Sequence, residues 1–154
     1  MFLAYIFGSI SLAFSFAIVG LLINTAIRKA AFYRQLSNFN FITSEKANHY
    51  LGVLYFRHIL KTTFWRHFNP TLKIIGRPDK EILQSLRNEM TYAEISHLIA
   101  FIFVLPLLVC IKLYDFYEDA FWPLLLANII FHIYPALVQQ YNKRRLDILL
   151  KRLK

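Results

Sequence analysis

Three long apolar stretches divide the chain, at about residues 2–27, 95–111 and 121–138. The first has no charged side chain, and at about 1.5 Å of rise per residue its helix would be about 39 Å long, more than the ~30 Å hydrocarbon core of a bilayer. The other two, of about 17–18 residues, are at the short end of a membrane span. Asn128 and His132 lie inside the third stretch, where they are costly in lipid unless they face protein or water. The pattern predicts three transmembrane helices.

The first stretch differs from a secretory signal peptide. No Lys or Arg precedes it, and it is longer than the apolar region that such a peptide carries before its cleavage site. We therefore expect residues 2–27 to be retained as a membrane helix.

The loop at residues 28–94 holds two segments with helical patterns. In Tyr50–Phe68 aromatic and basic residues alternate, with Arg57 and Lys61 on one helical face. The apolar face would consist of Leu51, Leu54, Tyr55, His58 and Ile59. We expect an interfacial helix, because Tyr and Trp sit at headgroup depth while Lys and Arg meet anionic lipid. The same mixture can stack nucleic-acid bases, but a segment tethered between two spans is poorly placed for that, and we expect no nucleic-acid partner.

The second segment of the loop begins with Arg-Pro-Asp at residues 77–79. Proline suits a first helical turn, and acidic side chains suit its positive end. Leu83, Leu86 and Met90 then follow at helical spacing. No helix breaker intervenes before Ile95, so we expect one helix that runs into the second span.

The distribution of charge predicts how the chain is oriented. The chain is 57% hydrophobic, above the usual value of about 45–50%, yet it has 18 Lys+Arg against 9 Asp+Glu. Residues 28–93 hold 11 basic and 4 acidic side chains, residues 112–120 hold 1 and 3, and the tail at residues 139–154 holds 6 and 1. Because basic loops stay in the cytoplasm, we expect the N-terminus outside, the C-terminus inside, and both the loop 28–94 and the tail on the cytoplasmic side.

Length and cysteine content narrow the class further. A chain of 154 residues allows one domain, and we expect residues 1–154 to form a single all-α membrane domain. There is no room for a separate cofactor module. The lone cysteine, Cys110, excludes an intrachain disulfide and a zinc site built on a pair of thiolates. We expect no metal.

Polar side chains where the second span begins are the first candidates for chemistry. Glu94 and His97 are three residues apart and are therefore neighbours on one helix face, on the same helix as Glu89. A carboxylate beside an imidazole can fix its tautomer and raise its basicity, which suits removal of a proton from a hydroxyl group. The same spacing is also typical of an interfacial ion pair.

His132 reaches a depth similar to that of His97 if the second and third spans are antiparallel. Two such histidines can line a shared polar pocket, ligate haem or a metal, or satisfy the polar groups of a neighbouring helix. The spacing alone leaves these interpretations open.

Two motifs carry a family resemblance. Residues 89–97, Glu-Met-Thr-Tyr-Ala-Glu-Ile-Ser-His, resemble the Glu-Thr-x-Arg-Ala-Glu-x-x-His signature of the small bacterial glycosyl-4,4'-diaponeurosporenoate acyltransferase family. Residues 138–146, Val-Gln-Gln-Tyr-Asn-Lys-Arg-Arg-Leu, resemble the family's Val-Gln-Arg-Tyr-Asn-Arg-x-Arg-Leu close, and Arg57–Lys61 is loosely similar to a basic Arg-Arg-Trp-Lys element. The resemblance covers about residues 50–148. Met90, Tyr92 and Gln140 depart from the family pattern.

The resemblance implies an enzyme that esterifies a sugar hydroxyl of a glycosylated carotenoid with a fatty acyl chain. It implies His97 as the base and Glu94 as the partner that orients it. Substrate contacts would come from Glu89, Arg57, Tyr141, Asn142, Arg145 and His132. The donor would be acyl-CoA or another activated acyl group, with no further cofactor. The acceptor would be a glycolipid or another lipid-linked hydroxyl at the cytoplasmic leaflet of the bacterial inner membrane.

A non-catalytic alternative stays open from the residues alone. The small size, the Phe-rich first helix and the lack of a complete catalytic constellation also suit an accessory subunit of a larger membrane complex. In that case the partner would be a membrane protein or a second copy of the chain.

Overall fold

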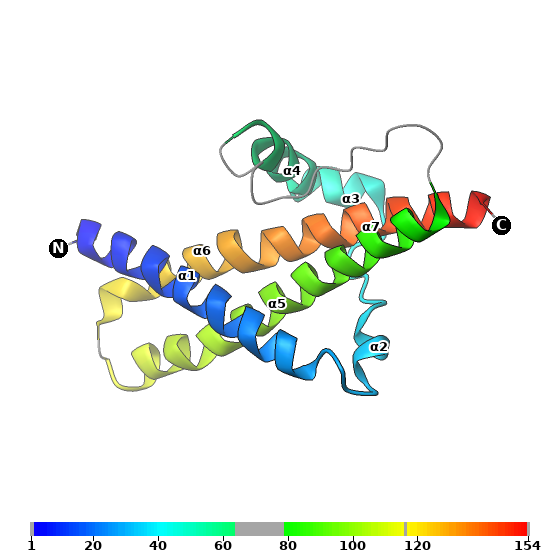
Figure 1. The fold of residues 1–154 in the computed structure, drawn as a ribbon. Helices are drawn as coiled ribbons and strands as arrows, with labels where there is room; N and C mark the ends of the chain where they lie inside the picture. The colour runs from blue at the N-terminus through cyan, green and yellow to red at the C-terminus, as the bar shows by residue number, and fades with distance from the viewer. Residues whose placement is uncertain (1, 64–78, 116, 154) are drawn as a thin grey trace. The chain divides into compact units, whose positions relative to one another are not determined.

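The computed structural model describes residues 2–63, 79–115 and 117–153, and every regular element within these ranges is a helix (Figure 1). The all-α prediction is thereby confirmed for the described residues. Trp65, Phe68, Arg77 and Pro78, on which part of the loop prediction falls, lie outside them. The elements are α1 (Phe2–Ile27), α2 (Tyr33–Leu36), α3 (Glu45–Tyr50), α4 (Val53–Thr62), α5 (Lys80–Leu113), η2 (Glu118–Ala120), α6 (Phe121–Asn128), η3 (Ile129–Ile133) and α7 (Tyr134–Arg152).

Within the described residues, three helical stretches are long and apolar enough to cross a membrane: α1, α5 and the run Glu118–Arg152 that comprises η2, α6, η3 and α7. The bounds of α1 coincide with the first predicted span, and the other two stretches contain the predicted spans at 95–111 and 121–138. The helix predicted to run from the loop into the second span is α5, with 34 residues. Asp79 caps it, since its Oδ1 accepts a hydrogen bond of 3.0 Å from the Glu81 N–H.

The chain forms two compact units. One, here called the apolar unit, comprises Met1–Leu36 and Ala93–Ala136, and the other, the basic unit, comprises Ser37–Tyr92 and Leu137–Lys154. The apolar unit has 4 Lys+Arg and 4 Asp+Glu, whereas the basic unit has 14 and 5. The whole formal net charge of +9 therefore belongs to the basic unit.

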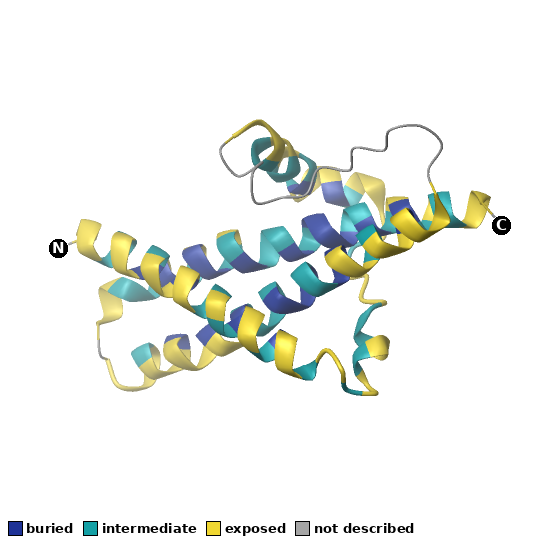
Figure 2. Ribbon diagram, viewed as in Figure 1, coloured by how far each residue is buried: buried dark blue, intermediate teal, exposed yellow. Residues whose placement is uncertain are grey.

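In the apolar unit α1 contacts α6 and η3. Its core is a cluster of Val104, Leu108 and Leu124, against which four partly buried residues pack: Phe16, Ile111, Phe121 and Leu125. Much of α1 faces outward (Figure 2), including the large apolar side chains of Phe2, Leu3, Phe7, Ile18 and Leu22. An outward apolar surface of this kind suits a helix whose solvent is lipid.

A close contact between α1 and α5 depends on Gly20. A Cβ atom added there would overlap the carbonyl oxygen of Ser96 and lie 3.0 Å from the Ala100 Cβ. One turn further along α1, the Asn24 Nδ2 donates a hydrogen bond of 2.8 Å to the Ser96 Oγ. Small residues let helix backbones approach closely in membranes, and a hydrogen bond between helices strengthens the contact.

The third apolar stretch contains a π-helical turn, η3, that the periodicity did not predict. Pro135 follows it after one residue, Tyr134. In a regular α-helix, Pro135 would leave the Phe131 carbonyl without its N–H donor and would crowd it sterically. A wider turn relieves that crowding, and π-turns are frequent at functional sites. His132 lies within this turn.

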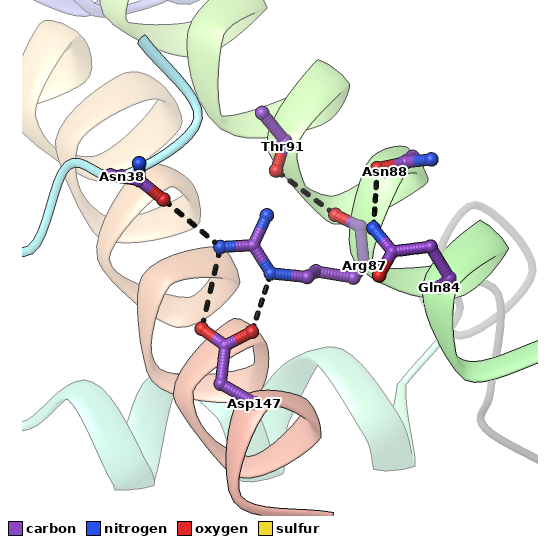
Figure 3. Close-up of polar contacts among 6 residues, drawn as sticks. All are labelled: Asn38, Gln84, Arg87, Asn88, Thr91 and Asp147. Atoms are coloured by element: carbon purple, nitrogen blue, oxygen red, sulfur yellow. Dashed lines mark hydrogen bonds and ion pairs between the residues drawn. The ribbon is translucent and has the colours of Figure 1, made fainter. Parts of the chain in front are cut away.

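The basic unit is held by an apolar cluster and an ion pair. The predicted helical face of Leu83 and Met90 packs against Leu146 of α7, together with Leu86, Leu149 and Leu150. Beside it, both Nε and Nη2 of Arg87 donate to the carboxylate of Asp147, and Nη2 also donates to Asn38 at 3.2 Å (Figure 3). These contacts join α5, α7 and the segment before α3.

The first part of the predicted interfacial segment is α4, which follows α3 after a sharp turn. Gly52 makes that turn with φ of 71°, a left-handed conformation that glycine adopts without strain. Val53 is the buried residue of α4, whereas Leu51 and Tyr55 of the predicted apolar face are exposed. Part of the face is thus open for contact with a membrane surface, while Leu54 and Ile59 are half-buried, and its interfacial location stays a prediction.

We predict that Gly20→Ala destabilises the protein. The added methyl group meets backbone atoms of α5, and overpacking of this kind costs about 1–3 kcal/mol. Gly8→Ala is the matched control, because nothing lies within 4 Å of a Cβ added at Gly8 and alanine favours a helix by up to about 1 kcal/mol over glycine. Thermal unfolding in detergent micelles should show a lower midpoint for Gly20→Ala only. Equal midpoints for the two variants would contradict the close crossing.

We also predict that Asp147→Asn lowers the free energy of unfolding by about 1 kcal/mol or more, because Arg87 is largely buried and keeps its charge. The control is Glu118→Gln, which removes a carboxylate that is 3.6 Å from Lys112 in an exposed pair. That change should cost less than about 0.5 kcal/mol. Denaturant titration of both variants in micelles checks the difference, and an equal loss would refute it.

Candidate functional site

The apolar unit brings together polar side chains from two spans. Glu94 and His97 lie one turn apart on α5, and Glu94 is completely buried. His132, in η3, is also completely buried, and its ring centroid lies 6.0 Å from that of His97, with an angle of 44° between the ring planes. The two histidines are therefore close in space, as two antiparallel spans require.

His132 and its neighbour Asn128 retain unused hydrogen-bonding capacity within the described part of the chain. There neither ring nitrogen of His132 meets hydrogen-bond geometry, although the backbone carbonyl of Ala13 lies beside the ring. On the preceding turn the Asn128 Nδ2 donates to the carbonyl of Phe101 at 3.3 Å, while its Oδ1 has no partner among these residues. Buried polar atoms without partners cost free energy, so this is a place where a polar group of a ligand would be favoured.

The chemistry open to this group is proton transfer. An imidazole next to a carboxylate on one helix face can take a proton from a hydroxyl group that reaches it. Within the described ranges no group of three or more His, Cys, Asp or Glu side chains could hold a metal ion.

In the basic unit, Tyr141 of α7 is the centre of a second polar group. The guanidinium carbon of Arg57, from α4, lies 5.5 Å from the centroid of its ring, and that of Arg144 lies 5.8 Å away. The Arg57 Nε also donates a hydrogen bond of 2.9 Å to the Asn142 Oδ1. The predicted binding residues Arg57, Tyr141 and Asn142 are thus in direct contact.

Two further cations complete the cluster around Arg57. Burial lowers the pKa of the Arg57 guanidinium, and the charge of Arg145 lowers it further. The pKa of Lys61 is also lowered, first by burial and then by the charges of Arg57 and Arg145. Lys61 was not among the candidate site residues, although its position four residues after Arg57 on one helix face was the signal that could have found it.

The same stretch of α7 also has a structural task that sequence patterns did not indicate. The Gln140 Oε1 accepts a hydrogen bond of 2.9 Å from the Phe41 N–H. Arg144 donates to the Asn40 Oδ1 and to the carbonyl of Ile42. These two side chains therefore fix the segment before α3.

Glu89 stands apart from both groups. It is exposed on α5, and no hydrogen bond or ion pair links it to another described residue. Of the candidate residues, Glu94, His97 and His132 belong to the apolar unit. The others belong to the basic unit: Glu89, Arg57, Tyr141, Asn142 and Arg145.

Three span-forming helices with polar side chains buried among them define a helical membrane protein. A family model described as glycosyl-4,4'-diaponeurosporenoate acyltransferase (CrtO) matches residues 29–152, and the chain belongs to this family. The match confirms the resemblance seen in the motifs and extends it over most of both units. It indicates an acyltransferase of carotenoid biosynthesis. No curated protein and no solved structure matches the chain.

Proposed function

We propose that the protein is a membrane-bound acyltransferase that moves a fatty acyl group onto a hydroxyl of a glycolipid or another lipid-linked acceptor at the cytoplasmic leaflet. The observation that supports this most is the placement of Glu94 and His97. They stand one turn apart at a buried polar position, within the stretch matched by an acyltransferase family. An acceptor attached to a lipid reaches such a position from the bilayer without leaving it.

His97 acts as the general base in this proposal. It takes the proton of the acceptor hydroxyl while the hydroxyl oxygen attacks the carbonyl carbon of an activated donor such as an acyl thioester. An ester bond forms, the bond from the carbonyl carbon to sulfur breaks, and the thiolate leaves with the proton. Glu94 is a positioning residue that fixes the tautomer of His97. Transfer is direct, without an acyl-enzyme.

His132 and Asn128 bind the polar end of the acceptor. Both are completely buried, and both have polar atoms without partners among the described residues. The His97 and His132 rings are 6.0 Å apart, which supports a substrate hydroxyl that binds His132 and reaches the base. Proximity of this kind turns a bimolecular step into one within a complex.

The proposed location is the bacterial inner membrane, with the N-terminus outside and the C-terminus inside. The support is the charge of the basic unit, 14 Lys+Arg against 5 Asp+Glu, because segments rich in Lys and Arg stay in the cytoplasm. The short segment between α5 and α6, with Glu118 and Asp119, then faces outward. This orientation exposes the basic unit to soluble, anionic acyl donors.

We predict that His97→Ala abolishes acyl transfer without changing membrane insertion or abundance. A general base contributes about 10²–10⁴-fold to a rate, so product should fall below detection in cells. Lipid extracts of cells with and without the protein, compared by mass for species that differ by one acyl chain, provide the measurement. His49→Ala is the control, because His49 is an exposed histidine of α3.

A normal amount of product from His97→Ala would contradict the role of His97 as the general base. If no acylated lipid depends on the protein at all, and it co-purifies stably with a larger membrane protein, the accessory-subunit alternative is favoured instead.

The orientation predicts which cysteines a membrane-impermeant maleimide can label. In a Cys110→Ser background, Glu118→Cys should react in intact cells, since Glu118 is exposed and faces outward. Lys151→Cys, near the end of α7, should react only after permeabilisation. The opposite pattern would reverse the proposed topology.

A further inference from the structure

Three cations of the basic unit lie near one another. Arg57 and Lys61 project from α4, and Arg145 projects from α7 close enough to affect the ionisation of both. Within the described part of the chain none of the three forms an ion pair. The α7 carboxylate that could have balanced them, Asp147, is bound by Arg87 instead.

Arg57 is held in a fixed orientation. Its Nε is used by Asn142, and its guanidinium lies over the ring of Tyr141. Its two η nitrogens have no hydrogen-bond partner among the described residues. A guanidinium that is fixed in this way presents a rigid fork, which matches the geometry of phosphate oxygens.

The neighbouring arginines of α7 have different tasks. Arg144 is committed to Asn40 and Ile42, and it covers the ring of Tyr141. Arg145 is exposed and makes no hydrogen bond or ion pair to any described residue. Arg144 therefore stabilises the fold, while Arg145 is available to bind a ligand.

We propose that Arg57, Lys61 and Arg145 form a binding site for a phosphate ester. The proposal rests on the acyltransferase function, where the phosphate belongs to the activated acyl donor or to a lipid headgroup. Like charges repel one another, so the free protein carries a cost that an anion with two or more charges removes. Tyr55 of α4 is exposed, which suits the predicted interfacial location, where both kinds of phosphate are available.

A binding site can be distinguished from a cluster that only supports the fold, because stability and phosphate affinity then change independently. Removal of Arg145 takes away repulsion and no hydrogen bond, so the variant should be at least as stable as the wild type while it binds phosphate more weakly. A residue that merely supports the fold would lose stability and binding together.

The test measures binding of coenzyme A, as a soluble phosphate ester, by calorimetry on the full chain in a zwitterionic detergent. We expect saturable binding to the wild type that weakens as salt rises. Arg145→Gln and Arg57→Gln should each weaken it by about tenfold, the effect of one charge-assisted hydrogen bond. Lys151→Gln is the control with the same change of charge on exposed α7, and it should stay within about twofold.

A second arm identifies the source of the phosphate. Binding is measured to vesicles of phosphatidylcholine alone and to vesicles with added phosphatidylglycerol. Binding of coenzyme A that depends on Arg57 and Arg145 supports a soluble donor. If the dependence on these residues is seen with phosphatidylglycerol vesicles but not with coenzyme A, the phosphate belongs to a lipid headgroup. The proposal is overturned if neither probe binds, if all three variants lose binding equally, or if Arg145→Gln is destabilised.

Binding is measured without turnover, so this test and the test of function fail separately. His97→Ala should bind the phosphate probe like the wild type. Normal activity of that variant together with binding that depends on Arg145 would remove the catalytic role of His97 and leave the phosphate site in place.

Discussion

Hydrocarbon cannot satisfy a polar atom, so each polar side chain within a membrane helix needs a partner on another helix or in a ligand. This constraint organises the apolar unit. Asn24 meets it through Ser96, at the crossing that Gly20 makes possible, and Asn128 meets half of it through the Phe101 carbonyl. Asn128 and His132 keep polar atoms without partners among the described residues, and the proposed function uses these atoms to bind the substrate.

The second organising constraint is electrostatic. The apolar unit has no formal net charge, so the charges near its helices can be balanced locally, as Lys112 and Glu118 show. The basic unit carries the whole net positive charge, because it has 14 Lys+Arg against 5 Asp+Glu. Asp147 neutralises Arg87, which lies in the packed region beside Leu83 and Leu146, and the outer cations are left unbalanced. If the proposed phosphate site is present, stability and recognition depend on different charged residues of one small unit.

Helices and their packing faces could be predicted from the sequence, whereas contacts between distant segments could not. The apolar stretches predicted α1 with its observed bounds, and the absence of a breaker before Ile95 predicted the long continuous α5. The spacing of Leu83, Leu86 and Met90 predicted the face that packs on Leu146. Each of these depends on residues close together in the chain, which is where helical periodicity carries information.

The contacts that the sequence did not reveal join distant segments with no periodicity of their own. Nothing in the residues around Asn40 indicates that Gln140 and Arg144 hold them, and nothing in α1 singles out Gly20 over Gly8. For the candidate site, the turn spacing of Glu94 and His97 follows from the helix alone. The partners of Arg57 on α7 became visible only in three dimensions.

The π-turn at Ile129–Ile133 bears on how related sequences are compared. A wide turn accommodates one residue more than an ordinary α-helical turn while the helix continues on both sides. A homologue one residue shorter here could close the same stretch as plain α-helix, with no loop to absorb the difference. An alignment would then place a single-residue gap in the middle of a membrane helix, where gaps are usually penalised. The histidine equivalent to His132 would be paired with the wrong column unless the turn is taken into account.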